Sequence, residues 1–239
     1  MRLMTPREWW RARLLRRMLR DRLRSRRDPA RGRITSADLA AVLAAARRET
    51  ARLTEAVPRE RDAGARVMVA SGIASLALYR ALLRSGIEKQ DAIELSSDVM
   101  YAAYRQQLWL VRLVGRAFGR NSLRQMELIQ RMLVWFPLGR GYQPELVHVA
   151  GAVAYDLHRC PVYEFFSGQG EEALEFFRAS WCTFDAALAE HLVDGGRYER
   201  PVTLSAGGAV CAMRWFAPAS PGEAARARRG LARTGVGPT

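Results

Sequence analysis

Hydrophobic residues recur at helical spacing through the first 135 residues of the chain. This pattern predicts an amphipathic helix over 7–27 and further helices over 37–56, 62–83, 89–114 and 121–135. Ser36 is a suitable N-cap for the second helix and Pro58 closes it, while Ser85-Gly86 ends the third. The third helix is apolar on nearly every side over 67–78, so we expect it to be the central buried helix.

The pattern changes after Pro137, Gly139 and Gly141. Residues 147–157 alternate small and apolar side chains in a β-like way, a short helix is predicted from Pro161, and a longer one over 171–192. Two strands, 198–204 and 210–216, are joined by Ala206-Gly207-Gly208, which is a hairpin signal. The predicted fold class is α+β, with a helical N-terminal half packed on a small antiparallel sheet that helices interrupt.

The net charge of +14 lies at the two ends of the chain. Residues 1–33 hold 13 Arg and 3 acidic residues, 217–239 hold 4 Arg and 1 Glu, and 34–216 hold 21 basic and 20 acidic residues. We therefore predict a basic amphipathic N-terminal helix within 1–33, a single α+β domain over 34–216 (helical over 34–136, α+β over 142–216) and a disordered tail over 217–239.

The neutral body does not favour a nucleic-acid partner. The helix over 7–27 either packs its Trp and Leu stripe on the body or forms a membrane-surface or RNA-binding arm. No apolar run reaches the roughly 18 residues of a membrane-spanning helix, and the N-terminus lacks the continuous apolar stretch of a secretory signal. Three cysteines cannot pair completely, which indicates free thiols and a cytoplasmic protein. If the third helix exposes an apolar stripe, that stripe needs a partner, which a homo-oligomer would supply.

All three cysteines lie in the α+β half of the chain. Cys160 directly precedes Pro161, so its thiol is expected at a helix N-terminus, where the helix dipole favours the thiolate. Arg159 adds positive charge beside it. Glu164 lies one turn further on, within reach as a proton acceptor.

Cys182 and Asp185 are three residues apart on a predicted helix and share a face. They suit a metal site, or a nucleophile with a proton shuttle, or a buried Cys beside an Asp that accepts a backbone hydrogen bond. Cys211 is either a core residue or part of the same site. By strand alternation Arg214 points to the opposite face, where it either grips a substrate carboxylate or is solvated.

The spacing of Cys160, Cys182 and Cys211 matches no zinc-finger pattern, and the sequence has no CxxC, HExxH, GxSxG or phosphate-binding glycine loop. The three thiols could nevertheless act as soft ligands of a metal such as zinc. Whether any cofactor is bound stays open on the sequence alone.

Several short motifs follow one another over about 147–216, namely Arg159-Cys160-Pro161, Glu164-Phe165-Phe166, Cys182-x-x-Asp185, Ala189-Glu190, Tyr198-Glu199-Arg200, Thr203-Leu204 and Gly207-Gly208-x-x-Cys211-x-x-Arg214. Their order and spacing resemble the L-2-amino-thiazoline-4-carboxylic acid hydrolase family. The helix–Ser-Gly–helix pattern over 77–92 and the Trp9-Trp10 opening are also similar to that family.

The resemblance implies a hydrolase that opens a cyclic amidine, such as L-2-amino-thiazoline-4-carboxylate, with water. In this interpretation Cys160, Cys182 and Asp185 are catalytic, and the substrate is a small molecule with a carboxylate. Arg159, Glu164, Cys211 and Arg214 would then bind the substrate. The family is also distantly similar to vinyl-reductase-type domains, so the alternative is a non-catalytic domain that binds a small molecule or a metal.

Overall fold

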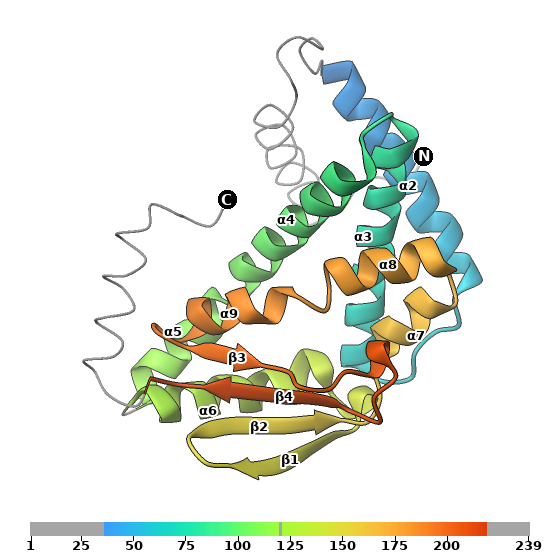
Figure 1. The fold of residues 1–239 in the computed structure, drawn as a ribbon. Helices are drawn as coiled ribbons and strands as arrows, with labels where there is room; N and C mark the ends of the chain where they lie inside the picture. Colours follow the sequence, from blue (N-terminus) through green and yellow to red (C-terminus); the bar gives the residue numbers. More distant parts are fainter. Residues whose placement is uncertain (1–35, 120, 219–239) are drawn as a thin grey trace. The chain divides into compact units, whose positions relative to one another are not determined.

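The computed structural model describes residues 36–119 and 121–218 (Figure 1). The predicted helix over 7–27 and all but the first two residues of the predicted tail lie outside these ranges. The described residues divide into two compact units, and the single domain over 34–216 stays a prediction. Unit 1 comprises 36–58 and 71–103, and unit 2 comprises 59–70 and 104–218.

Unit 1 is helical and contains α2 (Ser36–Ala56), most of α3 (Ala63–Arg84) and most of α4 (Lys89–Gln107). The predicted helices over 37–56 and 62–83 are thus confirmed. The α3 helix ends as its Ser-Gly signal indicates, because Gly86 takes a φ of +83° and its N–H donates to the carbonyl of Leu83 at 2.9 Å. Leu53, Leu76 and Leu82 are completely buried.

A buried carboxylate joins α2 to α3 inside unit 1. Glu49 of α2 accepts from Arg80 of α3 at 3.2 Å, lies 3.6 Å from Arg84, and pairs with Arg52 one turn away on its own helix. The hydrogen bond from Arg52 and those from the other arginines outweigh burial and lower the pKa of Glu49 to about 2. The carboxylate is therefore charged throughout the physiological range.

The α3 helix is long and apolar enough to cross a membrane, judged by length and composition alone. Of its most apolar stretch, 61% is buried inside the protein. A buried core helix has the same composition, so this is weak support for a span, and the predicted absence of a membrane-spanning segment stays a prediction.

After α4, unit 2 continues with a pair of packed helices, α5 (Trp109–Phe118) and α6 (Ser122–Leu133). The prediction of one helix over 89–114 is wrong, because Leu108 separates α4 from α5. Leu108 is buried and its ψ of −4° interrupts the helix. Asn121 caps α6, since its side chain accepts from the N–H of Arg124 at 2.9 Å.

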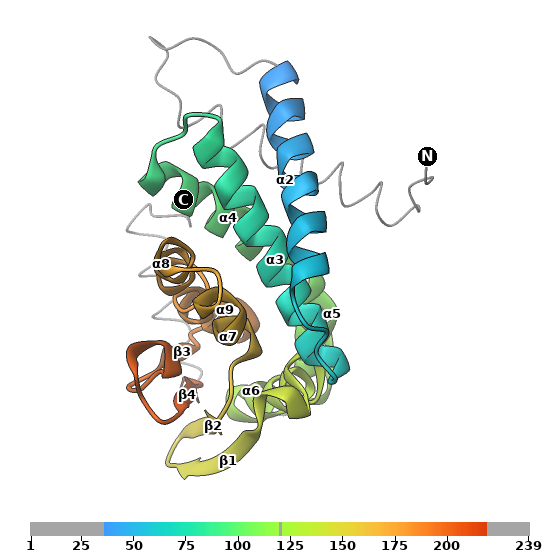
Figure 2. The same ribbon diagram turned by 90° about the vertical axis from the view of Figure 1, so that its right-hand side faces the viewer.

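The chain leaves α6 through η2 (Val134–Leu138), a π-helical turn, and η3 (Arg140–Tyr142). It then enters a four-stranded antiparallel sheet with the order β1-β2-β4-β3 (Figure 1). The strands are β1 (Pro144–Val149), β2 (Ala152–Leu157), β3 (Arg197–Glu199) and β4 (Cys211–Phe216). The α6 helix packs against β2 and β4, and α9 packs against β3 (Figure 2). The α+β prediction is confirmed.

Three helices interrupt the sheet between β2 and β3, namely α7 (Pro161–Ser167), α8 (Glu171–Ala179) and α9 (Phe184–Leu192). The short helix at Pro161 is confirmed, but the single helix over 171–192 is wrong. Ser180 and Thr183 donate their hydroxyls to the carbonyls of Phe176 and Ala179, at 2.6 and 3.0 Å. These local bonds occupy backbone acceptors at the end of α8, where the chain turns before α9. Cys182 lies in that turn.

The hairpin predicted for 198–204 and 210–216 is correct in the pairing of its strands and wrong in their connection. β3 and β4 are antiparallel neighbours, but β3 ends at Glu199, shortly before Pro201, which has no N–H for a ladder. The η4 turn (Leu204–Ala206) follows, and Gly207 closes it with a φ of +85°. The loop is therefore longer than a two-residue hairpin turn, and it carries side chains of its own.

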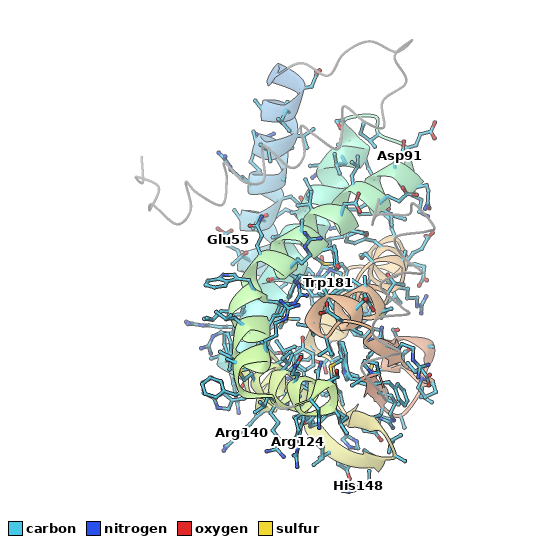
Figure 3. All side chains as sticks on the ribbon, turned by 90° about the vertical axis from the view of Figure 1, so that its left-hand side faces the viewer. Glu55, Asp91, Arg124, Arg140, His148 and Trp181 are labelled. Atoms are coloured by element: carbon cyan, nitrogen blue, oxygen red, sulfur yellow. The ribbon has the colours of Figure 1, made fainter. Side chains whose placement is uncertain are left out.

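An aromatic cluster forms the core of unit 2 beside these helices. Phe166 is completely buried, and its ring centroid lies 5.0, 5.2 and 5.9 Å from those of Phe165, Phe177 and Phe176. Trp181, from the turn between α8 and α9, extends the cluster at 6.3 Å from Phe166 (Figure 3). This packing fixes the turn that carries Cys182.

Candidate functional site

The three cysteines of unit 2 line one cavity with a volume of about 80 Å³. Cys160, Cys182, Cys211 and Asp185 all contribute to its wall, although they come from three separate segments. Apolar and aromatic side chains form most of the remaining wall, including Leu157, Phe177, Trp181 and Met213. The structure therefore brings together the four residues that the sequence singled out for thiol and carboxylate chemistry.

Cys160 is the N-cap of α7, as Pro161 indicated, and its Sγ accepts from the N–H of Tyr163 at 3.4 Å. The expected thiolate is not supported. Burial raises the pKa of Cys160 to about 12, and the hydrogen bond from Tyr163 offsets only part of that effect. At neutral pH this thiol is protonated.

The η4 turn supplies a hydrogen bond to each of the other two thiols. The Sγ of Cys182 lies 3.3 Å from Oγ of Ser205, and the Sγ of Cys211 accepts from the N–H of Leu204 at 3.3 Å. Burial raises the pKa of both thiols, while these hydrogen bonds and the charge of Arg200 act in the opposite direction. Cys182 and Cys211 are thus neutral, and both lie within the electrostatic influence of a cation.

Asp185 and Arg200 form an ion pair in the cavity wall. Nη1 of Arg200 lies 3.1 Å from Oδ2 of Asp185, and the two side chains are only 12% and 14% exposed. Arg200 also donates to the carbonyl of Cys182, and its guanidinium lies 5.4 Å from the ring centroid of Tyr198. Burial raises the pKa of Asp185, although the charge of Arg200 holds it back. The carboxyl group is therefore suited to proton transfer.

Arg159 and Glu164 do not line the cavity. Arg159 donates to Glu164, with Nε at 2.8 Å from Oε1, and to Oε1 of Glu60 through Nη2 at 2.6 Å. This pairing joins the start of α7 to the segment before α3. The substrate-binding roles predicted for Arg159 and Glu164 gain no support from this position.

Arg214 likewise lies away from the cavity. It points to the opposite face of β4 from Cys211, as strand alternation predicted, and Nη2 lies 2.6 Å from Oδ1 of Asp156 on β2. It also donates to the carbonyl of Tyr155 at 3.0 Å. A carboxylate bound in the cavity would be out of its reach, so the cation available there is Arg200.

Sequence reasoning missed Arg200 and Ser205 as site residues. Arg200 stands in the Tyr198-Glu199-Arg200 motif and precedes Pro201, but nothing in its neighbourhood indicated that it folds back onto α9. Ser205 follows Thr203, whose hydroxyl accepts from the N–H of Ala206 at 3.1 Å. A Thr-x-Ser pattern before two glycines is a turn signal that could have drawn attention to this segment.

The three thiols do not form a metal centre in this structure. Among the residues it describes, no group of three His, Cys, Asp or Glu side chains is arranged to hold a metal ion. The thiols are free, and each already accepts or shares a hydrogen bond. The donor set therefore does not fit the thiolate-bound zinc that the sequence left open.

Comparison with known proteins gives no relative from which to transfer a function. No protein-family model matches the chain, and the curated proteins and the solved structures contain no significant match to it.

Proposed function

We propose that the protein is a hydrolase that opens a small cyclic amidine carrying a carboxylate, of the type of L-2-amino-thiazoline-4-carboxylate. The observation that carries this proposal is the Asp185–Arg200 ion pair beside the Cys182 thiol in an otherwise apolar cavity. The motif resemblance over 147–216 points to the same class of substrate. An amidine needs a nucleophile for its central carbon and a group that moves protons, and both are present.

Arg200 is the residue that we assign to the substrate carboxylate. Its planar guanidinium can bind a carboxylate through two parallel N–H donors. A substrate carboxylate would compete with Asp185 for the guanidinium, and Asp185 would then lose part of the charge that lowers its pKa. Binding would therefore make Asp185 a stronger proton acceptor at the moment when one is needed.

Cys182 is the best placed nucleophile of the three thiols. It alone combines a hydroxyl neighbour, Ser205, with a backbone carbonyl bound by Arg200 and a carboxyl three residues away. Cys160, which the sequence favoured, has a pKa of about 12 because it is buried. The proposal therefore assigns attack to Cys182, proton transfer to Asp185, and a supporting position in the wall to Cys160 and Cys211.

The chemistry balances with water as the only co-substrate. The sulfur of Cys182 bonds to the amidine carbon while its proton passes to Asp185, and the ring C–S bond then breaks as Asp185 protonates the leaving ring sulfur. The product of this step is an isothiourea on Cys182. Water adds to the same carbon, one of its protons goes to the former ring nitrogen, and Asp185 passes the other to the sulfur of Cys182 as the bond between this sulfur and the carbon breaks. The carbamoyl product then leaves with the thiol restored.

Mass spectrometry of L-2-amino-thiazoline-4-carboxylate incubated with the protein tests this proposal. The parent protein should add one water to the substrate, and Cys182→Ala and Asp185→Asn should abolish the conversion. Asp91→Asn, a substitution of the same type on α4 at a residue outside the cavity wall, should turn over substrate like the parent. Parent-like turnover by Cys182→Ala would refute the assignment of the nucleophile.

A binding function without turnover is the second candidate. The raised pKa values of all three thiols favour it, because no thiolate is present at neutral pH to attack. In that case isothermal titration would detect saturable binding that Arg200→Met weakens, while the ligand would keep its mass. Such a result would retain the cavity as a ligand site and remove the hydrolase.

A further inference from the structure

Exposed apolar side chains are concentrated on one stretch of unit 2. The described residues include ten large hydrophobic side chains that are exposed, and seven of them lie between residues 109 and 136. These seven, which we call the aromatic patch, are Trp109, Leu110, Leu113, Phe118, Leu123, Trp135 and Phe136. Trp135 is 83% exposed and Phe118 is 74% exposed. A cluster of this kind marks a surface that contacts an apolar partner.

The orientation of α5 is opposite to that of an ordinary surface helix. Leu113, one turn after Trp109, is 53% exposed, whereas the buried residue of the helix is Gly115. A Cβ on Gly115 would come within 2.7 Å of the Ile129 side chain of α6, so this glycine allows the close packing of the two helices. The inner side of α5 also carries Arg112, which pairs with Asp194 at 3.0 Å. Trp109, Leu110, Leu113 and Phe118 of α5 are therefore left exposed, while Val111 and Val114 are half buried.

The same stretch is strongly basic. Residues 105–143 contain seven Arg and one Glu, although the whole of 34–216 is nearly neutral. Arg124 and Arg131 share Glu127, so the cluster keeps a positive charge after pairing. Arg112 and Arg116 also share one carboxylate, Asp194, but Arg112 lies on the inner side of α5, so this pair adds little charge to the exposed face. Arg124 and Arg140 project from unit 2 in Figure 3.

We propose that the aromatic patch docks unit 2 on an anionic lipid surface, with α5 lying flat at the boundary between headgroups and acyl chains. Tryptophan is favoured at that boundary because one part of its ring system is apolar and its N–H is polar. Exposed arginines of the same stretch, such as Arg124 and Arg131, complement anionic headgroups. The ten residues of α5 are too few to span a bilayer, so the helix lies on the membrane.

Charge complementarity favours a lipid surface over a second copy of the chain. A twofold dimer through this patch would bring together two copies of the same basic surface, and their like charges would repel. An anionic membrane has no such repulsion. The lipid proposal therefore explains both the exposed aromatic side chains and the excess of arginine.

Vesicle co-sedimentation with the full-length protein tests the proposal. The parent protein should bind vesicles of phosphatidylcholine mixed with phosphatidylglycerol, and bind pure phosphatidylcholine much more weakly. Leu113→Glu should reduce partitioning into the mixed vesicles by about tenfold or more, because it removes an inserted apolar side chain and adds repulsion. Leu146→Glu is the matched control, since Leu146 is 61% exposed but lies on β1 outside the patch.

Three results would overturn the proposal. The first is Leu113→Glu binding mixed vesicles as the parent does. The second is loss of binding with Trp10→Ser alone, which would assign the membrane contact to the N-terminal segment. The third is conversion of a dimer to a monomer by Leu113→Glu, seen by light scattering, with unchanged vesicle binding. Unchanged far-UV circular dichroism of the variants excludes misfolding as the cause.

Discussion

Replacing Arg200 by Met should destabilise unit 2 in a way that depends on pH. The substitution keeps an unbranched side chain but removes the cation from an ion pair whose members are 12% and 14% exposed. Asp185 would then be a carboxylate buried in an apolar wall without its counter-ion. Removing one member of a buried pair costs about 3–5 kcal/mol.

Without Arg200, Asp185 can bind a proton instead of staying charged. The free energy of that protonation is therefore the upper limit of the charge-dependent part of the loss in stability. An aspartate with an ordinary pKa near 3.9 needs about 4 kcal/mol to be protonated at pH 7, and about 1.4 kcal/mol less for each unit of lower pH. The pKa of Asp185 is already raised by burial, and removing Arg200 raises it further. A group whose pKa is raised on folding stabilises the protein at pH values below its unfolded-state pKa. That contribution is lost as pH rises through its folded-state pKa. We therefore expect a loss of about 3–4 kcal/mol at pH 7 and roughly 1–2 kcal/mol at pH 5.

Urea unfolding followed by tryptophan fluorescence measures this difference, because Trp181 and Trp215 are buried in unit 2. The double variant Asp185→Asn/Arg200→Met should recover most of the loss, since neither charge remains. Arg197→Met is a matched control from an exposed ion pair, with a 71% exposed arginine, and should cost less than about 1 kcal/mol. Equal losses at pH 5 and pH 7 for Arg200→Met would refute the electrostatic reasoning and leave only lost packing.

Three further predictions follow from individual contacts. Cys160 has a pKa of about 12, so its alkylation by iodoacetamide should stay slow in the folded protein at pH 7, and fast modification on peptide mapping would contradict this. The contribution of the Cys160 thiol to stability should be lost as pH rises from about 9 towards 12. Glu49 has a pKa of about 2, so its contribution should be present above pH 4.5 and fall on acidification. Glu49→Gln should cost roughly 1–2 kcal/mol at pH 7 in thermal unfolding and much less at pH 2. Asn121→Ala should cost about 1 kcal/mol because it removes the cap of α6, whereas Asn121→Ser should keep most of that stability in the same measurement.

The end of α3 and the start of α7 were predictable because local sequence determines both boundaries. Ser85-Gly86 ends α3 through contacts within one turn, and Pro161 begins α7 in the same way. The breaks at Leu108 and at 180–183 were not predictable, because hydrophobic periodicity continues across both. At the second break the hydroxyls of Ser180 and Thr183 bond to the preceding carbonyls, and such residues also occur within unbroken helices.

The three thiols and the carboxyl group of the site were predictable from the sequence, whereas its cation, Arg200, was not. Strand alternation correctly separated Arg214 from Cys211, but it could not reveal that Asp156 on β2 neutralises Arg214, because that pair depends on sheet register. The position of Arg200 depends on how the segment after β3 folds back onto α9. Neither arrangement leaves a periodic signal in the sequence.

The composition of the cavity argues for function on energetic grounds. A buried ion pair such as Asp185–Arg200 gives little net stability over apolar side chains of similar volume, because desolvation offsets the attraction. The pKa of Asp185 is raised, so the attraction of Arg200 compensates only in part for the desolvation of this carboxylate. The η4 turn also orients Cys182 and Cys211 through hydrogen bonds, which an apolar core would not need. Ionisable and nucleophilic groups held at such a cost are typical of sites where a ligand completes the electrostatics, and Arg200 is the group through which an anionic ligand would do so.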